Sequence, residues 1–218
     1  MRRFRQQTRG AGLALLLFPL PAEATVSLDG SNCLLFGGAR PERELAQCVT
    51  FISGGHTLTV SLIGKAPNHV TRITLSRDGA PPFQILHTRV APLISRTDIG
   101  VLFKDWNFDG HRDLGIMRTS DPVAAEPMRF FIFDPDAGEF VRSRELEELT
   151  APRTDASSNR IISTRRQGVR RFEDHYAWRA GSLTLIERTE RDLSTKSCRK
   201  ITYAWHQNRQ SESTERPC

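Results

Sequence analysis

Apolar and polar residues alternate with a period of two along most of the chain from residue 25 onward. β-Branched and aromatic residues fill the apolar positions, and the runs end at Gly, Pro, Asn or Asp. This pattern is typical of half-buried β-strands joined by turns. We therefore predict about thirteen short strands: Leu34–Phe36, Cys48–Ile52, Thr57–Ile63, Val70–Leu75, Phe83–Thr88, Ile99–Lys104, Asp113–Arg118, Arg129–Asp134, Phe140–Arg142, Arg160–Arg166, Phe172–Arg179, Ser182–Arg188 and Lys200–Gln207.

Helical periodicity is confined to one short segment. Residues Ser143–Leu149 predict one or two helical turns, in which Ser143 caps the N-terminus and Glu145 and Glu147 lie near its positive end. The rest of the chain offers no comparable helical pattern.

Hairpins are predicted where Pro or Gly separates two strand ends, as in residues 133–140 and 178–183. Successive hairpins form an antiparallel meander. We therefore predict an all-β fold, specifically a small, about five-bladed β-propeller-like domain whose ring need not be complete, with a β-sandwich as the alternative. The polar segment Arg209–Pro217 is expected to be a loose tail unless Cys218 is bonded.

The N-terminus has the layout of a secretory signal peptide. Four arginines in the first nine residues precede the apolar run Ala11–Leu20, which ends in Pro21-Ala22-Glu23-Ala24. The run is about half as long as a membrane-spanning helix. We predict a signal peptide over residues 1–24, cleaved after Ala24, and one β-domain over residues 25–218. The mature chain is then periplasmic or secreted and has no transmembrane segment.

The charge balance argues against a nucleic-acid partner. The chain has 31 Lys and Arg against 25 Asp and Glu, a net charge of +6. Removal of residues 1–24 takes away four arginines and one glutamate and leaves +3. Phosphate-backbone binding needs clustered cations, whereas the remaining basic pairs alternate with acidic residues. With 38% hydrophobic and 26% charged residues, the chain is neither disordered nor a polytopic membrane protein.

All four cysteines lie in the predicted exported part, at Cys33, Cys48, Cys198 and Cys218. An even number in an oxidising compartment predicts two disulfides. Three connectivities are possible. We favour Cys33 with Cys48 and Cys198 with Cys218, because each pair then closes a short local loop. The spacings match no zinc pattern.

Residues 105–113 read D-W-N-F-D-G-H-R-D and form the one motif with clear chemistry. Side-chain oxygens of Asp105, Asn107, Asp109 and Asp113, with the backbone carbonyl of His111, are hard donors in the order of a calcium loop, and a glycine at the sixth position permits the sharp turn. We predict Ca²⁺ as the bound ion, with Mg²⁺ second. The alternative is an Asn/Asp-rich turn that bonds its own backbone without metal.

The flanking residues predict that this loop joins two strands. The twelfth position, which is Glu in an EF-hand, is Ile116, and apolar strand-like residues precede and follow the loop. Trp106 and Phe108 alternate with the ligands and are expected to pack on the domain. Only His111 among nearby residues could assist catalysis, so a structural role for the ion is favoured.

Several stretches around this loop carry a resemblance to a known family: Val101–Lys104, Phe131–Pro135, Gly138, Phe140, Glu145-Leu146, Ile161–Ser163, Tyr176–Trp178, Gly181 and Leu183. Together they resemble small secreted bacterial β-propeller-like proteins that carry one integrin-type calcium loop. Characterised members are immunity proteins that inhibit peptidoglycan-degrading toxins and resemble lysozyme inhibitors. The resemblance implies a lysozyme-like peptidoglycan hydrolase as protein partner, with type IV secretion as the expected route of the toxin.

The inhibitory residues of that family cannot be carried over to this chain. The Ser-Gly-x-x-Tyr motif of some lysozyme inhibitors is not evident, since Ser53-Gly54-Gly55-His56 has no Tyr after it. The basic segment Arg165–Arg171 is a candidate contact because lysozyme-like clefts carry carboxylates. An ordinary charged hairpin is the favoured alternative.

Two other functions compete with the inhibitor. A secreted hydrolase would need a catalytic set, but the sequence has no G-x-S-x-G or H-E-x-x-H motif, and Glu173-Asp174-His175 lies in a predicted strand whose side chains alternate between faces. We therefore predict that the protein is not an enzyme. A calcium-stabilised adhesion or scaffolding module is the third interpretation, based on the integrin-like loop alone.

Overall fold

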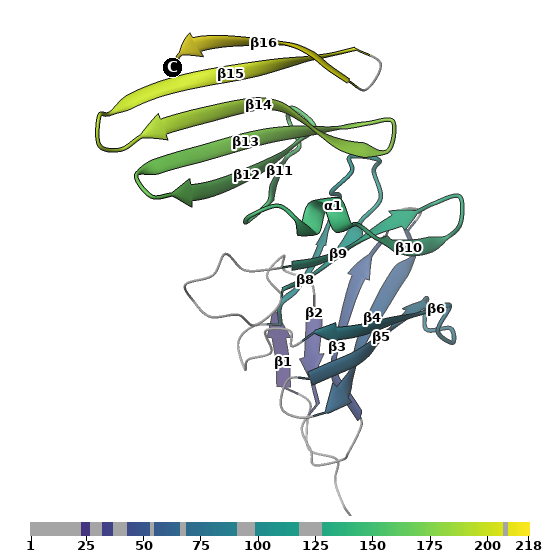
Figure 1. Cartoon of the computed structure of the whole chain (residues 1–218). Coiled ribbons are helices and arrows are strands. Elements are labelled where there is room, and N and C mark those ends of the chain that lie inside the picture. The colour runs from purple at the N-terminus through teal and green to yellow at the C-terminus, as the bar shows by residue number, and fades with distance from the viewer. Residues whose placement is uncertain are drawn as a thin grey trace, which may run out of the picture.

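The part of the chain that the structure describes is all-β, as predicted, and forms three antiparallel sheets and one short helix (Figure 1). This fold is seen in a computed structural model of the 218-residue chain. The structure describes residues 23–26, 32–36, 43–52, 55–65, 69–90, 99–117, 128–206 and 209–218.

The first sheet is a six-stranded meander in which each strand pairs with the next. Its strands are β1 (Glu23–Val26), β2 (Asn32–Leu35), β3 (Arg43–Phe51), β4 (Thr57–Lys65), β5 (His69–Arg77) and β6 (Gln84–Val90). The predicted cleavage point after Ala24 falls within β1. Residues 1–22 lie outside the described residues, so the signal peptide stays a prediction.

The second sheet has four strands in the order β10-β9-β8-β7. They are β7 (Val101–Lys104), β8 (Asp113–Met117), β9 (Met128–Asp134) and β10 (Glu139–Arg142). The predicted helix follows as α1 (Arg144–Glu147), and the hydroxyl of Ser143 accepts a hydrogen bond from the backbone amide of Leu146 at 3.4 Å, which confirms the predicted N-cap.

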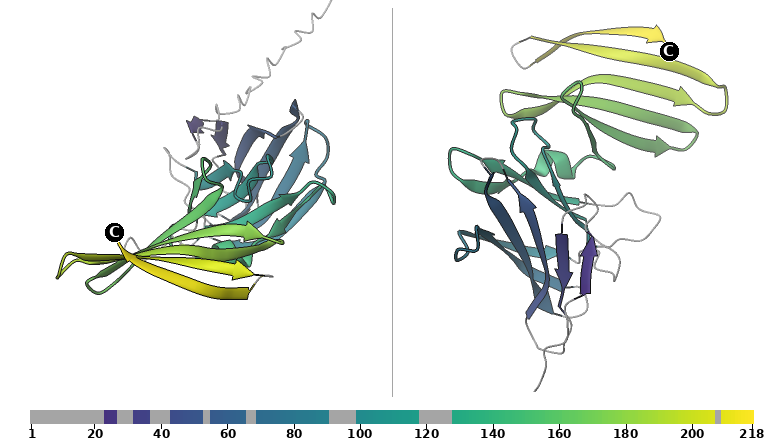
Figure 2. Two further views of the ribbon diagram at one scale, coloured as in Figure 1. Left: turned by 90° about the horizontal axis from the view of Figure 1, so that it is seen from above. Right: turned by 180° about the vertical axis from the view of Figure 1, so that it is seen from behind.

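The third sheet is another six-stranded meander and extends away from the other two, with β16 at its far edge (Figures 1 and 2). Its strands are β11 (Arg153–Asp155), β12 (Arg160–Gln167), β13 (Arg170–Arg179), β14 (Ser182–Asp192), β15 (Ser197–His206) and β16 (Arg209–Pro217). The segment Arg209–Pro217 is not a loose tail, in keeping with the condition that Cys218 is bonded. This segment pairs with β15 along its length, because an edge strand needs no apolar face to form a backbone ladder.

Two hydrophobic cores hold the three sheets together, and the four-stranded sheet lies between them. Alternate residues of β9 enter different cores. Phe131 and Phe133 pack with residues of the first sheet, whereas Phe130 packs with Leu146 of α1 and Ile161 of β12. The alternation follows from the two-residue period of a strand. The second sheet is therefore buried on both faces.

This layered packing corrects the prediction of about five propeller blades. The described residues form three sheets rather than five, and only the second has the four strands of a typical blade. They do not form a closed ring of blades. The first two sheets pack against each other across a shared core, as in the β-sandwich alternative. A period of two predicts strands but not how hairpins are grouped into sheets. The predicted grouping into propeller blades was therefore wrong although the strands were predicted.

Both disulfides have the favoured connectivity. Cys33 and Cys48 are direct cross-strand partners on β2 and β3 and are buried in the first core. Cys198 on β15 is bonded to Cys218, which follows β16 and so fastens the C-terminal strand. Two disulfides indicate that the chain folds in an oxidising, extracytoplasmic compartment. Among the described residues, no helix has the length and apolar character needed to cross a membrane.

Candidate metal-binding loop and adjoining groove

The loop at residues 105–113 joins β7 directly to β8, as its flanking residues predict. Lys104 and Asp113 are paired across the two strands, so the loop closes a hairpin of the second sheet. Two of its residues have left-handed backbone conformations, Phe108 with φ 62° and Gly110 with φ 87°. Glycine adopts such a conformation without strain, so the sixth position of the loop suits this residue.

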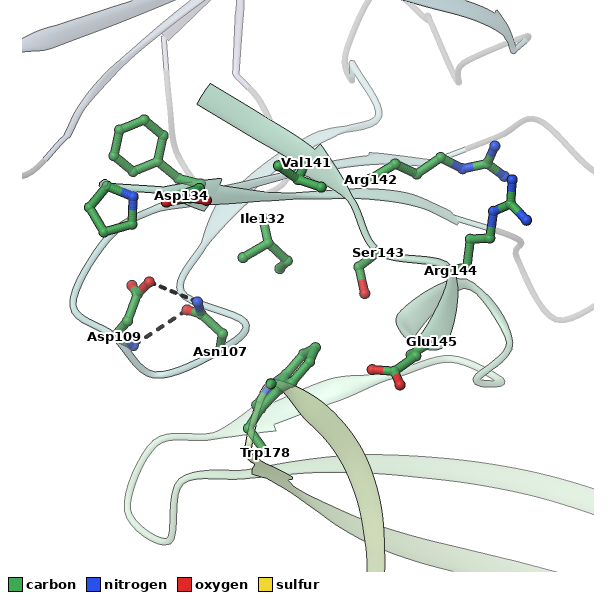
Figure 3. A pocket seen from close by; sticks show the side chains of 13 residues that line it. Asn107, Asp109, Ile132, Asp134, Val141, Arg142, Ser143, Arg144, Glu145 and Trp178 are labelled. Atoms are coloured by element: carbon green, nitrogen blue, oxygen red, sulfur yellow. Dashed lines mark hydrogen bonds between the residues drawn. The ribbon is translucent and has the colours of Figure 1, made fainter. Parts of the chain in front are cut away.

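Three polar side chains point into the loop and bond its backbone. The carboxylate of Asp105 accepts hydrogen bonds from the amides of Asp109 at 3.2 Å and Gly110 at 2.8 Å. Asp109 accepts one from the amide of His111 at 2.7 Å and another from the side-chain amide of Asn107 at 2.7 Å. Figure 3 shows Asn107 and Asp109 side by side. Oxygens from the first, third and fifth positions are thus gathered around one short turn.

The carboxylate of Asp113 lies deeper than the others. The residue is completely buried, and its two oxygens accept hydrogen bonds from the amides of Trp106 at 2.6 Å and Phe133 at 2.9 Å. Burial, together with the charges of Asp109 and Asp105, raises the pKa of Asp113 to about 7 despite the lowering effect of these two bonds. A cation nearby would lower that pKa again.

The donor types suit calcium, although the side chains do not enclose a formed site. In the described part of the chain, no three His, Cys, Asp or Glu side chains are grouped so as to hold a metal ion. The hydrogen bonds within the loop are also those of the metal-free Asn/Asp turn that was the alternative. A carboxylate has about four acceptor positions, so Asp105, Asp109 and Asp113 can each keep their backbone bonds and still contact a cation. The calcium site therefore stays a prediction.

The neighbouring aromatic residues pack on the domain as expected. The Trp106 ring is buried and meets Phe130 edge to face, with 4.8 Å between ring centroids. Phe108 packs against the same core. The ring of His111 lies 5.5 Å from that of Phe133, so its side chain faces β9.

The loop is bonded to all three sheets. Arg112 donates a hydrogen bond to the hydroxyl of Thr50 on β3 at 2.8 Å. Asp113 accepts one from β9 through Phe133, and the carbonyl of Trp106 accepts one from the indole of Trp178 on β13 at 2.9 Å. The loop therefore helps to hold the three sheets together.

A groove of about 560 Å³ opens beside the loop, between the second and third sheets. Its lining combines Asn107 and Asp109 of the loop with Ile132, Trp178 and Glu145 (Figure 3). The β13–β14 hairpin borders it, and the amide of Leu183 on this hairpin donates to Glu145 at 3.0 Å. The groove is thus lined by both apolar and polar side chains.

Sequence reasoning missed this groove because its walls come from segments far apart in the chain. The only signal for it was indirect, since Glu145 and Trp178 stand in stretches that carried the family resemblance.

Two other candidate groups are divided between opposite faces of the third sheet. His175 contacts Glu173 at 3.1 Å, whereas Asp174 on the other face is bonded by Arg188. The alternation predicted for these residues is confirmed. In the basic segment Arg165–Arg171, Arg165 stacks on Phe172 at 4.0 Å from the ring, on the face of Asp174.

Comparisons with known proteins give one structural likeness. No family model and no curated protein significantly matches the chain. A solved structure of a Xanthomonas type IV secretion system related protein superposes with a TM-score of 0.53 and 18% sequence identity. The alignment covers 80% of this chain and 96% of that one. At this identity, the likeness shows that the two chains share a fold.

Proposed function

We propose that this protein is an extracytoplasmic, calcium-binding immunity protein that binds and blocks a lysozyme-like peptidoglycan hydrolase. The observation that carries the proposal is the fold shared with a type IV secretion system related protein over 80% of the chain. The family resemblance of residues 101–185 points to the same class of protein. The two disulfides agree with a function outside the cytoplasm.

The arrangement of the sheets suits an inhibitor, because a rigid binding surface loses less entropy on association than a mobile one. Two cores fix the second sheet on both faces, and the 105–113 loop links it to the other two. Partner contacts can therefore be presented by strands and short hairpins.

Calcium would be held by Asp105, Asn107, Asp109, Asp113 and the carbonyl of His111. Its charge would offset the repulsion among three carboxylates, one of which is buried. The loop touches all three sheets, so we assign the ion a structural role.

Calcium is expected to stabilise the folded protein, and chelation to destabilise it. A ligand that binds only the folded state adds about 2.7 kcal/mol at a concentration 100 times its Kd. The Tm measured by scanning calorimetry should therefore rise when calcium replaces chelator. Asp109→Ala should abolish this rise. Asp136→Ala, in the exposed β9–β10 turn, removes the same charge and should leave it intact. Equal Tm values with calcium and chelator would refute a structural calcium site.

The inhibitor function is tested by the clearing of peptidoglycan suspensions. Purified full-length protein should slow clearing by a lysozyme-like hydrolase, above all one encoded beside its own gene, and should form a stable complex with it in size-exclusion chromatography. Failure to inhibit that hydrolase and a panel of animal-type and bacterial lysozymes would overturn the proposal. Binding to a surface polymer in the absence of inhibition would favour the adhesion module instead.

A further inference from the structure

The two faces of the third sheet carry their charges differently. On one face, both buried carboxylates are paired: Asp174 is bonded by Arg188, and Glu190 by Arg199. The opposite face gathers five basic residues, and we call it the cationic face: Arg166, Arg171, Arg191, Lys200 and Arg216. Direct cross-strand partners point to the same side of a sheet, so the register places these side chains together.

Strand register sets like charges opposite one another on the cationic face. Arg171 on β13 faces both Arg166 on β12 and Arg191 on β14. Lys200 on β15 faces Arg216 on β16. Like charges in directly opposite positions destabilise a sheet. A bound anion would remove this repulsion.

Few carboxylates offset these cations. Glu187 contacts Lys200 at 2.8 Å and is shared with Arg160 at 3.9 Å, so it offsets no more than one of the five. Glu173 is shared with Arg153 and His175. The remaining four basic residues are exposed and form no ion pair within the described part of the chain: Arg166, Arg171, Arg191 and Arg216. The cationic face therefore has charge available for a partner.

The cationic face is also hollowed. Two adjoining hollows of about 230 and 430 Å³ share Thr189 and Arg191, the first bordered by Arg171 and Glu173 and the second by Lys200. Neighbouring strands lie about 4.8 Å apart, so Arg166, Arg171 and Arg191 occupy a closely spaced row of backbone positions. Arginine binds carboxylates through two parallel hydrogen bonds, which makes such a row suited to an acidic surface.

Apolar side chains border the row of arginines. Val169 and Leu193 occupy the tips of the β12–β13 and β14–β15 hairpins and are 51% and 50% exposed. The amide of Leu193 bonds the carbonyl of Val169 at 2.9 Å, so the two tips lie together. Arginine beside exposed apolar residues is typical of protein interfaces, whereas phosphate polymers are bound mainly through cations. The disulfide between Cys198 and Cys218 fastens the edge strand β16 of this face to β15.

We infer that the cationic face is the surface on which this protein holds an acidic protein partner through arginine–carboxylate contacts. The identity of that partner rests on the proposed function: it is the peptidoglycan hydrolase, and the contacted surface is its carboxylate-bearing cleft. The sequence pointed to Arg165–Arg171 as a whole. The structure selects Arg166 and Arg171 from it, because Arg165 and Arg170 are paired with carboxylates on the other face.

A charge-matched pair of double variants tests the cationic face without any hydrolase. Arg171→Gln/Arg191→Gln removes the centre of the row, and Arg144→Gln/Arg179→Gln removes two exposed arginines outside the row, on α1 and at the other end of β13. The probe is a fluorescent oligoglutamate peptide titrated at low salt. The first variant should weaken binding about tenfold or more, and the second should change it little. Equal weakening in both, no binding to the unaltered protein, or binding of heparin but not of the peptide would overturn the inference. Thermal melts of the variants confirm that they fold.

The same variants separate this inference from the proposed function. If a hydrolase is inhibited, Arg171→Gln/Arg191→Gln should raise the inhibition constant about tenfold or more, while the control variant retains full inhibition. Unchanged inhibition by the first variant would overturn the cationic face as the partner site and leave the immunity function standing. Selective loss of peptide binding with no hydrolase inhibited would support the cationic face as an acidic-peptide site and refute the immunity function.

Discussion

Asp113→Ala is expected to lower the free energy of unfolding by about 2–6 kcal/mol even in the presence of chelator. The carboxylate is fully buried and accepts hydrogen bonds from the amides of Trp106 and Phe133. Alanine would leave both donors unsatisfied inside the protein, at about 1–3 kcal/mol each. Urea denaturation followed by circular dichroism measures the loss. Chelator ensures that a bound cation does not contribute to it.

Asp134→Ala is the matched control for this effect. Asp134 also accepts two backbone hydrogen bonds, from Asp136 at 3.0 Å and Ala137 at 3.1 Å, but these lie in an exposed turn. Water can replace that carboxylate, so the expected loss is about 1 kcal/mol or less. Asp113→Asn keeps one acceptor oxygen and should fall between the two. If Asp113→Ala destabilises the protein no more than Asp134→Ala, the buried carboxylate does not link the loop to β9.

The strands of this protein could be predicted from local pattern far better than their grouping into sheets. β4 shows why, since its residues alternate between intermediate and buried positions along almost its whole length. β8 has four consecutive buried residues, because the second sheet is covered on both sides. β16 has no apolar face to recognise, and only its pairing with β15 and the Cys198–Cys218 bond reveal it.

The candidate site likewise has a local part that the sequence predicts and long-range contacts that it does not. The spacing of Asp105, Asn107 and Asp109 is local, and the structure gathers their oxygens around one turn as predicted. The residues that bond this loop to the other sheets are distant in the sequence. Nothing near residue 106 in the sequence indicates that its carbonyl accepts a hydrogen bond from Trp178, seventy-two positions later. The cationic face likewise depends on strand register, which alternation alone does not fix.

Asp174→Ala is expected to destabilise the third sheet by about 2–4 kcal/mol. The side chain is 3% exposed and receives two hydrogen bonds from Arg188, at 2.6 and 2.9 Å, which raise the pKa of Arg188. Alanine would leave Arg188 without a carboxylate partner beside Phe172, and a partly buried cation without its counter-ion is costly. Urea denaturation gives the total, and hydrogen exchange of the β12–β14 amides should show that the loss begins in this sheet.

Two further variants identify the uncompensated charge as the cause of this loss. Glu173→Ala lies next to Asp174 on the opposite face, and its pair with Arg153 is more exposed, so about 1 kcal/mol or less is expected. Asp174→Ala also deprives Arg165 of its partner, but Arg188 is the more buried of the two cations. In Asp174→Ala/Arg188→Met that more buried cation is gone, and part of the lost stability should return. If the double variant is less stable than Asp174→Ala alone, Arg188 stabilises the sheet by packing on Phe172 and not through its charge pair. The ion pairs of that face would then contribute little to stability. Stability would no longer explain why charges are paired on that face and mostly unpaired on the cationic face.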